Sequence, residues 1–329
     1  MVEISAALVK ELREKTGAAM MDCKRALVQA GGDLDKACEV LRQEGINVAS
    51  KKASRTASEG LIVGKVAGDG KSAVILEVNS ETDFVARNEE FVNLTKKLTE
   101  TALKAKAKTV EEFLGAQADG STVEALISQT VAKTGENIVV RRISFFDLGN
   151  KPGLFGLYIH SLGGKIGALV KFETSAPLAS DTFSREVAMH VVFAKPQYLS
   201  KENVPASERE NEKRIESGKA DLADKKTEIR DKIIAGRLDK LIAERCLLEQ
   251  PFVKEPAISV NKYIEEQAQQ LKTEIKVTDY SLMILGEKAD PIDPPMGRSD
   301  EDGAPMPQGP NSHNPNKEIA LAVPSDAKE

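Results

Sequence analysis

The sequence predicts an α+β protein: an N-terminal three-helix module, a two-copy core of antiparallel sheets covered by helices, a projecting helical hairpin and a disordered C-terminal tail. Apolar residues recur with the helical period up to Gly45 and with the strand period of two from Gly60 onward. A strand, a turn and a helix follow one another twice in the middle of the chain, and the last segment lacks the apolar content of a folded one.

The composition is that of an ordinary globular chain. It has 329 residues, a formal net charge of -5 and 41% hydrophobic residues, which allows two or three domains at about 100–200 residues each. The acidic balance disfavours a general polyanion binder, because affinity for a phosphate backbone requires a surplus of Lys and Arg on one surface. No apolar run approaches the roughly 20 residues of a transmembrane helix, and no signal-peptide pattern is present. We expect a cytoplasmic protein, or one already processed.

The cysteines and histidines do not form a metal-binding pattern. Three Cys are widely spaced without a CxxC pair, and only three His accompany them. They are Cys23, Cys38, Cys246, His160, His190 and His313. We expect reduced thiols, no metal and no cofactor.

The C-terminal segment 289–329 carries the whole net charge. It has three basic and eight acidic residues, and it holds eight of the 14 prolines and no aromatic residue. Such a segment cannot bury enough apolar surface to offset the entropy lost on ordering. We predict that it is disordered and that the preceding body is electrically neutral.

Three amphipathic patterns define an N-terminal module over residues 1–46. Helices are predicted over Ile4–Lys15 and Met20–Ala30, and a third begins after its N-cap Asp33. Breaks are expected at Gly31, Gly32 and Gly45. The polar, basic stretch 47–59 is predicted to be a linker or an extended helix end.

Two core subdomains are predicted, over residues 60–137 and 138–200. In the first, alternating apolar residues give two strands around a turn at Gly68–Gly70, and Thr82–Leu103 has helical periodicity. The second is expected to contain a strand over Ile138–Phe146, a hairpin around Gly163 and Gly164, a strand over Ile166–Phe172 and a helix over Asp181–Phe193.

The two core units superpose at an offset of 92 residues, which predicts a duplication. The offset places Val78 on Val170, Glu81 and Thr82 on Glu173 and Thr174, and Phe91 on Phe183. Residues 201–250 are highly charged with apolar residues at helical spacing, and are predicted to form an antiparallel helix pair. Residues 251–288 would return to the second subdomain with a helix over Phe252–Leu271 and a strand over Ile275–Leu285.

Motifs for side-chain catalysis are missing. The stretch Gly64–Ser72 looks like a phosphate loop, but the required spacing needs a glycine where Lys65 stands, and the stretch lies in a predicted hairpin. His160 and His190 have no Cys or carboxylate at catalytic spacing. We therefore predict that the protein is not an enzyme.

The two core units differ after their shared Glu-Thr. The first continues with Asp83 and Phe84, whereas the second has the small residues Ser175 and Ala176 followed by Pro177. Because the second unit makes the same turn without a large side chain, we expect a partner outside the fold to use Phe84. In the alternative interpretation, Phe84 packs into its own core and Asp83 caps the following helix.

Long motifs in this chain resemble those of the bacterial elongation factor Ts family. The segments that carry the resemblance are Leu8–Leu27 (LVKELREKTGAAMMDCKRAL), Glu77–Phe91 (EVNSETDFVARNEEF), Thr134–Arg142 (TGENIVVRR) and Ala188–Pro196 (AMHVVFAKP). The resemblance implies a guanine nucleotide exchange factor that binds the GDP complex of the GTPase elongation factor Tu and promotes GDP release, so that GTP rebinds during translation elongation. It implies no direct contact with nucleic acid or membrane, and a heterodimer or a 2:2 complex with elongation factor Tu.

The resemblance assigns nucleotide release to one turn of four residues, Thr82, Asp83, Phe84 and Val85. This turn would insert beside the magnesium site of the GTPase. Phe84 would wedge between two helices of the partner and Asp83 would hold them shifted, which disturbs the magnesium and phosphate contacts.

Nine further positions match partner-binding residues of the family: Lys10, Leu12, Arg13, Met20, Met21, Lys24, Lys52, Gly135 and His160. The first six would meet a helix of the GTPase domain, Gly135 would lie near the magnesium-site helices, and His160 would touch the partner's third domain. Simpler interpretations remain open, namely Met20 as a core residue, His160 as a surface residue and Lys52 as a solvated lysine.

The chain departs from the family pattern in two places. Thr134 stands where the family often has an apolar residue. Pro291, Pro294 and Pro295 forbid a continuous helix after the last strand, where well-known members carry a helix that grips the GTPase. The alternative function is a ribosome- or RNA-binding translation accessory module without exchange activity, and a third class is an enzyme using Cys23 or His160.

Overall fold

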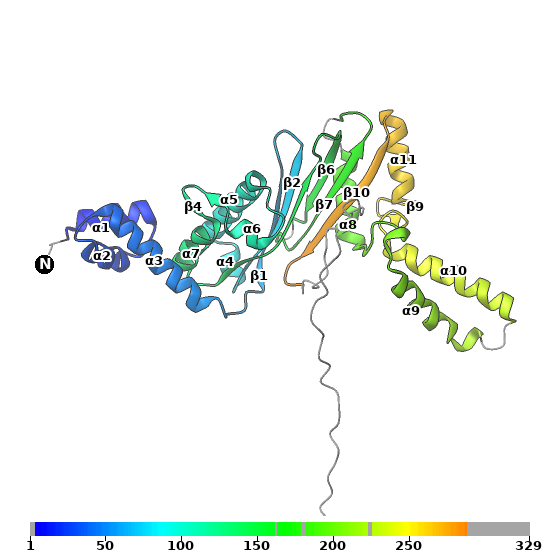
Figure 1. Cartoon of the computed structure of the whole chain (residues 1–329), viewed down its shortest axis with the longest axis horizontal. Coiled ribbons are helices and arrows are strands. Elements are labelled where there is room, and N and C mark those ends of the chain that lie inside the picture. Colours follow the sequence, from blue (N-terminus) through cyan, green and yellow to red (C-terminus); the bar gives the residue numbers. More distant parts are fainter. Residues whose placement is uncertain (1–3, 162, 179–181, 223–225, 288–329) are drawn as a thin grey trace, which may run out of the picture. The chain divides into compact units, whose positions relative to one another are not determined.

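The computed structural model describes residues 4–161, 163–178, 182–222 and 226–287. These residues form a mixed α+β fold with N-terminal helices and small antiparallel sheets accompanied by helices (Figure 1). The predicted disordered tail 289–329 lies outside the described residues. No helix in the described part of the chain is long and apolar enough to span a membrane.

The N-terminal helices α1 (Ala6–Thr16), α2 (Met20–Gln29) and α3 (Leu34–Lys52) follow from caps in the sequence. The Ser5 hydroxyl accepts the Leu8 N–H at 3.2 Å and starts α1, and Gly17 ends α1 with a left-handed φ of 68°. The Asp33 carboxylate accepts the N–H groups of Asp35 and Lys36 and starts α3, as predicted. The three helices share a small core of buried apolar residues: Val9, Leu12, Cys23, Ala26, Leu27 and Ala37.

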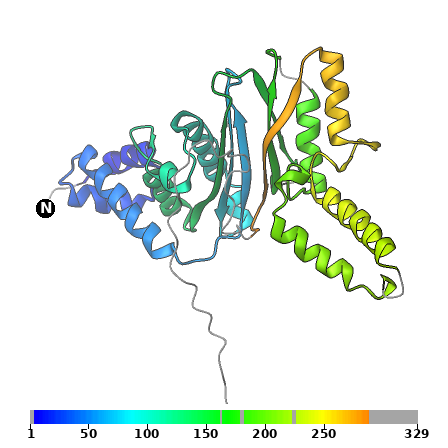
Figure 2. The same cartoon turned by 45° about the vertical axis from the view of Figure 1, so that its right-hand side comes forward.

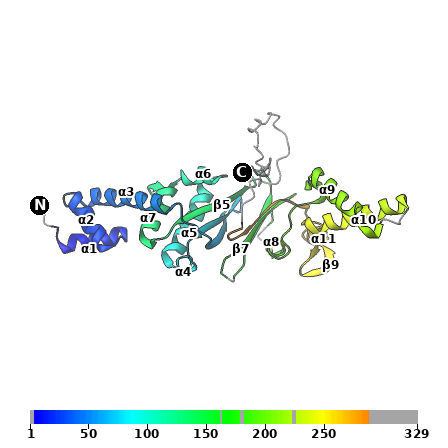
Figure 3. The ribbon, with the colours of Figure 1, turned by 90° about the horizontal axis from the view of Figure 1, so that it is seen from below.

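Helix α3 does not end at Gly45. It continues to Lys52, so the linker predicted from residue 47 is wrong for its first six residues, and the alternative of an extended helix end is confirmed there. Gly45 is buried, and a Cβ there would meet Ser128 and Ala132 of α7 (Val123–Thr134). Helices α3 and α7 lie side by side (Figure 3). A glycine inside a helix costs about 1 kcal/mol relative to alanine, and packing against α7 offsets that cost.

Two three-stranded antiparallel sheets form the body. The first has the order β1 (Glu59–Val66), β2 (Ser72–Ser80) and β5 (Ile138–Asp147). The second has the order β10 (Ile275–Ile284), β7 (Ile166–Thr174) and β6 (Gly153–Ile159). Residues 138–147 were predicted to belong to the second subdomain, but β5 pairs with β2, so this strand belongs to the first sheet.

Each sheet has its own covering helices (Figure 2). The first sheet is covered by α4 (Asp83–Ala86), α5 (Glu89–Ala105), α6 (Val110–Leu114) and α7, and the second by α8 (Thr182–Ala194) and α11 (Val260–Leu271). The inner faces of the two sheets meet in a third cluster that includes Ile75, Phe146, Leu169 and Met283. The order of layers is therefore helices, sheet, sheet and helices.

Two predicted elements differ in detail, and four further elements were not predicted. The single helix predicted over Thr82–Leu103 is interrupted at Arg87 and Asn88, and the Asn88 side chain caps α5. The start of the helix predicted over Phe252–Leu271 is a small hairpin of β8 (Pro251–Phe252) and β9 (Glu255–Ser259). Helices α6 and α7 and the short pair β3 (Gln117–Ala118) and β4 (Ser121–Thr122) were not predicted.

The two sheets repeat the same strand register. Nine residue pairs join β2 to β5, from Ser72 with Asp147 to Ser80 with Ile138. Nine pairs also join β7 to β10, from Ile166 with Ile284 to Thr174 with Ile275. Each ladder has a bulge at the same step, which leaves Arg141 unpaired in β5 and Thr278 in β10.

This register corrects the predicted offset. The central strands superpose at 94 residues, so Ser80 corresponds to Thr174. The predicted matches of Val78 with Val170 and of Glu81 and Thr82 with Glu173 and Thr174 are therefore wrong. Phe91 and Phe183, 92 residues apart, are both buried in the helices that follow these strands. The second connection is therefore two residues shorter than the first.

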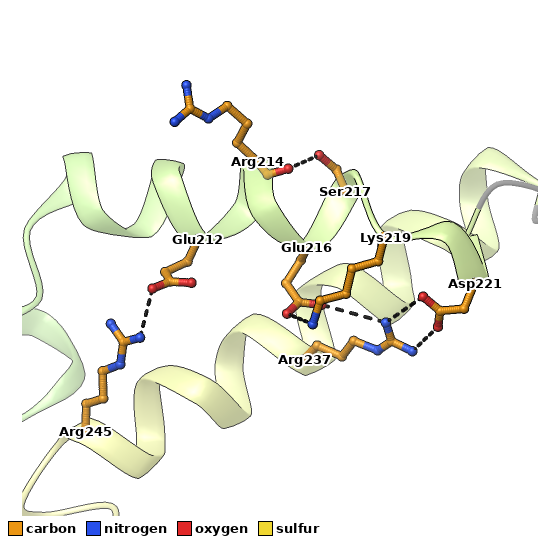
Figure 4. A network of polar contacts seen from close by, with 8 residues as sticks. All are labelled: Glu212, Arg214, Glu216, Ser217, Lys219, Asp221, Arg237 and Arg245. Carbon is orange, nitrogen blue, oxygen red and sulfur yellow. Dashed lines mark hydrogen bonds and ion pairs between the residues drawn. The ribbon is translucent and has the colours of Figure 1, made fainter.

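The predicted helix pair consists of α9 (Ala206–Ser217) and α10 (Thr227–Arg245), which lie side by side (Figures 1 and 4). Two arginines of α10 hold α9 and the turn that follows it. Arg245 contacts Glu208 and Glu212 at 2.5 and 2.8 Å, and Arg237 lies between Asp221 and the buried Glu216 (Figure 4). At the base, the N–H groups of Gln197 and Tyr198 donate to the Arg245 carbonyl, and Leu247 N–H donates back to the Tyr198 carbonyl.

Candidate functional site

The turn predicted to act on a partner forms the four-residue helix α4. The Thr82 hydroxyl caps it by accepting the Val85 N–H at 3.4 Å. Val85 and Ala86 pack into the core under the first sheet. Phe84 points away from this core and is 80% exposed, so the alternative interpretation of Phe84 as a core residue is wrong.

Asp83 lies beside Phe84 in the first turn of α4. Its carboxylate pairs with the exposed Arg87 guanidinium at 3.0 Å, four residues later. Thr82 caps α4, and the Asn88 side chain caps α5 by accepting the Glu90 N–H at 2.9 Å. Asp83 is therefore not the cap of the following helix, and its carboxylate remains on the surface next to Phe84.

Two glutamates attach this turn to the chain that connects α7 to β5. Both carboxylate oxygens of Glu136 accept hydrogen bonds from Thr82, one from the N–H at 3.0 Å and one from the hydroxyl at 2.6 Å. One carboxylate oxygen of Glu81 accepts the Asn137 N–H at 2.7 Å. Both glutamates stand inside the motifs ETDF and TGEN, but no role was predicted for either side chain.

Two further predicted residues contact each other close to this point. The Lys52 ammonium, at the end of α3, donates to the Gly135 carbonyl, at the end of α7. Gly135 takes a left-handed φ of 78° as the C-cap of α7. The interpretation of Lys52 as a solvated lysine is therefore wrong. Gly135 directly precedes Glu136 in the chain, so Lys52 holds the residue next to Glu136.

The predicted docking residues of the N-terminal helices are exposed, with one exception. Met20 and Met21 are 53% and 70% exposed, so Met20 is not a core residue. Lys10, Arg13 and Lys24 are exposed as well. Leu12 is fully buried between α1 and its neighbours, so the predicted contact of Leu12 with a partner is corrected to a core role.

His160 lies apart from α4, in the hairpin that joins β6 to β7. It is half-buried, and its Nδ1 is 3.0 Å from the Tyr158 hydroxyl. The Arg185 guanidinium lies over the Tyr158 ring, 5.2 Å from its centre. The hairpin also contacts β1, because the Ile62 N–H donates to the Gly164 carbonyl.

The described residues contain no cluster of three or more His, Cys, Asp or Glu that could hold a metal ion. Cys23 is fully buried, and burial raises the pKa of the Cys246 thiol to about 11. Neither thiol is suited to nucleophilic chemistry.

The fold and the site thus define an α+β protein that carries an exposed aromatic side chain on a short, anchored helix. Residues 81–287 match the family described as Elongation factor TS. The chain is 45% identical to elongation factor Ts of Arthrospira platensis over 256 residues, which cover 78% of this chain and 100% of the relative. It is 41% identical to elongation factor Ts of Nostoc sp. strain PCC 7120 over 296 residues, which cover 87% and 94%. The chain belongs to the elongation factor Ts family.

Proposed function

We propose that this chain promotes GDP release from elongation factor Tu by inserting α4 into the GTPase. As a member of the elongation factor Ts family, it is a nucleotide exchange factor for elongation factor Tu in translation elongation and not an enzyme. The observation that supports a role for α4 is the 80% exposure of Phe84 on a helix whose other apolar residues are anchored in the core.

The exposed side chain of Phe84 supplies binding energy at the moment of contact. Burying a phenylalanine side chain contributes about 1.5–3 kcal/mol, and this contribution is unused in the free protein. In the proposed complex, Phe84 is buried between two helices of the GTPase and this free energy favours their separation. The neighbouring Asp83 carboxylate holds the two helices in a shifted position. The magnesium and phosphate contacts of GDP are weakened as a result.

No covalent step is required, because exchange follows from coupled binding. If the factor lowers the affinity for GDP by some ratio, GDP lowers the affinity for the factor by the same ratio. The ternary complex is therefore transient, and it dissociates either by GDP release or by loss of the factor. GTP then binds the nucleotide-free GTPase.

The N-terminal helices are proposed as the docking anchor. They carry five exposed side chains that are long and either basic or apolar, namely Lys10, Arg13, Met20, Met21 and Lys24. A methionine side chain adapts readily to an apolar partner. Lys52 and Gly135 would affect partner binding by fixing the position of the C-terminal end of α7. His160 would make a separate contact with the partner. The predicted heterodimer or 2:2 assembly and the action in the cytoplasm remain part of this proposal.

The proposed domain organisation changes in two places. The N-terminal module of residues 1–46 extends along α3 to Lys52, and the division between the core subdomains falls after Asp147 instead of before Ile138. The matching registers and bulges of the two sheets support the proposal that the core arose by duplication. In this division, α9 and α10 are an insertion within the second copy.

The experiment that tests the function is the release of labelled GDP from elongation factor Tu. Wild-type protein should accelerate release, and Phe84→Ala should slow the accelerated rate by roughly 10- to 100-fold, the effect of losing a binding hot spot. The matched control is Phe193→Ala in α8, because Phe193 is similarly exposed at 74% but lies in the other copy. No acceleration by the wild type would refute the function, and equal rates for Phe84→Ala and Phe193→Ala would refute only the role of Phe84.

A further inference from the structure

The four-residue helix α4 requires external support. A single helical turn is unstable alone, because fixing its backbone dihedrals yields only one or two hydrogen bonds. The Asp83–Arg87 ion pair is exposed on the surface, and exposed ion pairs contribute little. Phe84 contributes nothing to the turn, since it faces solvent. The remaining supports are the packing of Val85 and Ala86 and the contacts of Thr82.

Glu136 fixes both polar groups of Thr82 at once. Its Oε2 accepts the Thr82 N–H at 3.0 Å and its Oε1 accepts the Thr82 hydroxyl at 2.6 Å, and hydrogen bonds to a carboxylate are about twice as strong as neutral ones. A hydroxyl has one proton to donate. Because that proton is directed at Glu136, the hydroxyl is oriented so that a lone pair of Thr82 Oγ1 accepts the Val85 N–H that begins α4.

Glu136 is itself held on a rigid frame. The preceding residue, Gly135, ends α7 and its carbonyl accepts the Lys52 ammonium. In the following residue, Asn137, the side-chain amide donates to the Arg55 carbonyl at 2.9 Å and the N–H donates to Glu81 at 2.7 Å. The backbone on both sides of Glu136 is therefore tied to the end of α3, to Arg55 beyond it and to Glu81.

The second copy has no counterpart of α4 among its described residues, so comparing the two copies shows which hydrogen bonds of the connections the sheet needs and which serve α4. By strand register, Glu274 corresponds to Asn137 and Ser175 to Glu81, and the Glu274 N–H donates to the Ser175 hydroxyl at 3.0 Å. This bond between the two connections is thus common to both copies. The counterpart of Glu136 is Thr273, a neutral residue that bonds to Ser175, so the carboxylate at 136 is not needed to close the sheet.

We propose that Glu136 is a positioning residue for nucleotide exchange, which holds Thr82 and thereby orients α4 so that Phe84 meets the GTPase. This inference rests on the proposed function of α4. It predicts that Glu136 affects the rate of the nucleotide-releasing step more than it affects docking, since the exposed residues of α1 and α2 are untouched by its removal.

The test measures the maximal rate of GDP release and the concentration of factor that gives half of it. Glu136→Ala should lower the maximal rate roughly 10-fold, the equivalent of about 1.4 kcal/mol, with the half-saturating concentration changed less than about 3-fold. Glu136→Gln keeps an oxygen for the Thr82 N–H and should recover the rate to within about 3-fold of wild type. The matched control is Glu112→Ala, because Glu112 also accepts a backbone N–H, that of Lys108, at 2.9 Å.

Combining Glu136→Ala with Phe84→Ala distinguishes positioning from a general loss of structure. If Glu136 acts through Phe84, the double variant should be no slower than Phe84→Ala alone; a purely structural effect would multiply the two losses. Thr82→Val removes the hydroxyl while preserving shape, and should slow exchange about 3-fold even if Glu136→Ala folds poorly. Wild-type rates for Glu136→Ala, or multiplied losses in the double variant, would overturn the inference. A wild-type protein without activity would instead refute the proposed function.

Discussion

The two connections that lead from a central strand to a covering helix begin in the same way and then diverge. The Ser80 hydroxyl donates to the Thr82 carbonyl at 2.9 Å, and its counterpart Thr174 donates to the Ala176 carbonyl at 2.7 Å. Phe91 follows Ser80 by 11 residues in the first copy, whereas Phe183 follows Thr174 by nine in the second. Both copies thus close the turn with a hydroxyl hydrogen bond. The connection of the first copy is two residues longer and contains α4 with its exposed Phe84.

The largest expected effect follows from making the two connections equal in length. Deleting Asp83 and Phe84 should reduce the acceleration of GDP release by at least about 100-fold, because α4 and its wedge are lost together. Circular dichroism should remain close to wild type, since the second copy folds with the shorter connection. Retained exchange activity would show that the added residues are unrelated to nucleotide release.

A second comparison concerns Gly60 and Gly153, which occupy matching positions in the outer hairpin strands. A Cβ at Gly60 would collide with the Val78 carbonyl oxygen, and a Cβ at Gly153 would collide with that of Phe172. We expect Gly60→Ala and Gly153→Ala each to lower the free energy of unfolding by about 2–4 kcal/mol, measured by denaturant titration. Gly68→Ala is the control, because a Cβ there meets nothing within 4 Å. Tolerance of either core variant would contradict the equivalence of the two hairpins.

The buried His190 should make the stability of the second copy fall at acidic pH. Its Nδ1 accepts the Val253 N–H at 3.2 Å and its Nε2 lies 3.1 Å from the Gln250 side-chain oxygen. Burial lowers the pKa of the imidazole, so its contribution to stability is complete above the unfolded pKa of about 6.5 and is lost as pH falls toward the folded pKa.

Replacing this histidine should remove the pH dependence. His190→Leu leaves the Val253 N–H without its acceptor and should cost about 1–3 kcal/mol of stability at pH 8, with a flatter profile between pH 5 and 7. The half-buried His160, changed to Gln, should alter stability by less than about 0.5 kcal/mol. Thermal unfolding at several pH values measures both, and an unchanged profile in His190→Leu would assign the acid sensitivity to other groups.

The smallest expected effect concerns Asp279, which occupies the position in the second sheet that Arg142 occupies in the first. Arg142 bonds to the buried Glu77 at 2.6 Å, whereas burial raises the pKa of Asp279 to about 7. A raised carboxyl pKa means that stability is complete below the unfolded value of about 3.9 and is lost as pH rises through 7. Asp279→Asn, which keeps an acceptor for the Tyr280 N–H, should raise stability by about 1 kcal/mol at pH 8 and not at pH 5. A destabilised variant at pH 8 would instead indicate a favourable ionic contact of Asp279.

Local patterns in the sequence predicted most strands and helices, while contacts between distant segments decided what it missed. The alternation around Gly68–Gly70 gave β1 and β2, and Asp33 gave the start of α3. The sequence could not show that Gly45 would be buried against α7, or that β5 would pair with β2. The comparison of the two units and the family motifs both predicted that Phe84 is available to a partner, and the structure exposes it. The burial of Leu12 and the bonds of Glu136 to Thr82 depend on tertiary packing.

The helix pair α9 and α10 enters and leaves the fold at one point. Backbone hydrogen bonds between residues 197–199 and 245–248 close its base, so the cost of closing this loop depends little on the length of chain inserted beyond it. The pair is stabilised by its own ion pairs between Arg237 or Arg245 and the acidic residues of α9 and its turn. We therefore expect this segment to behave as a modular insertion, whose length and surface can change while both sheets keep their register.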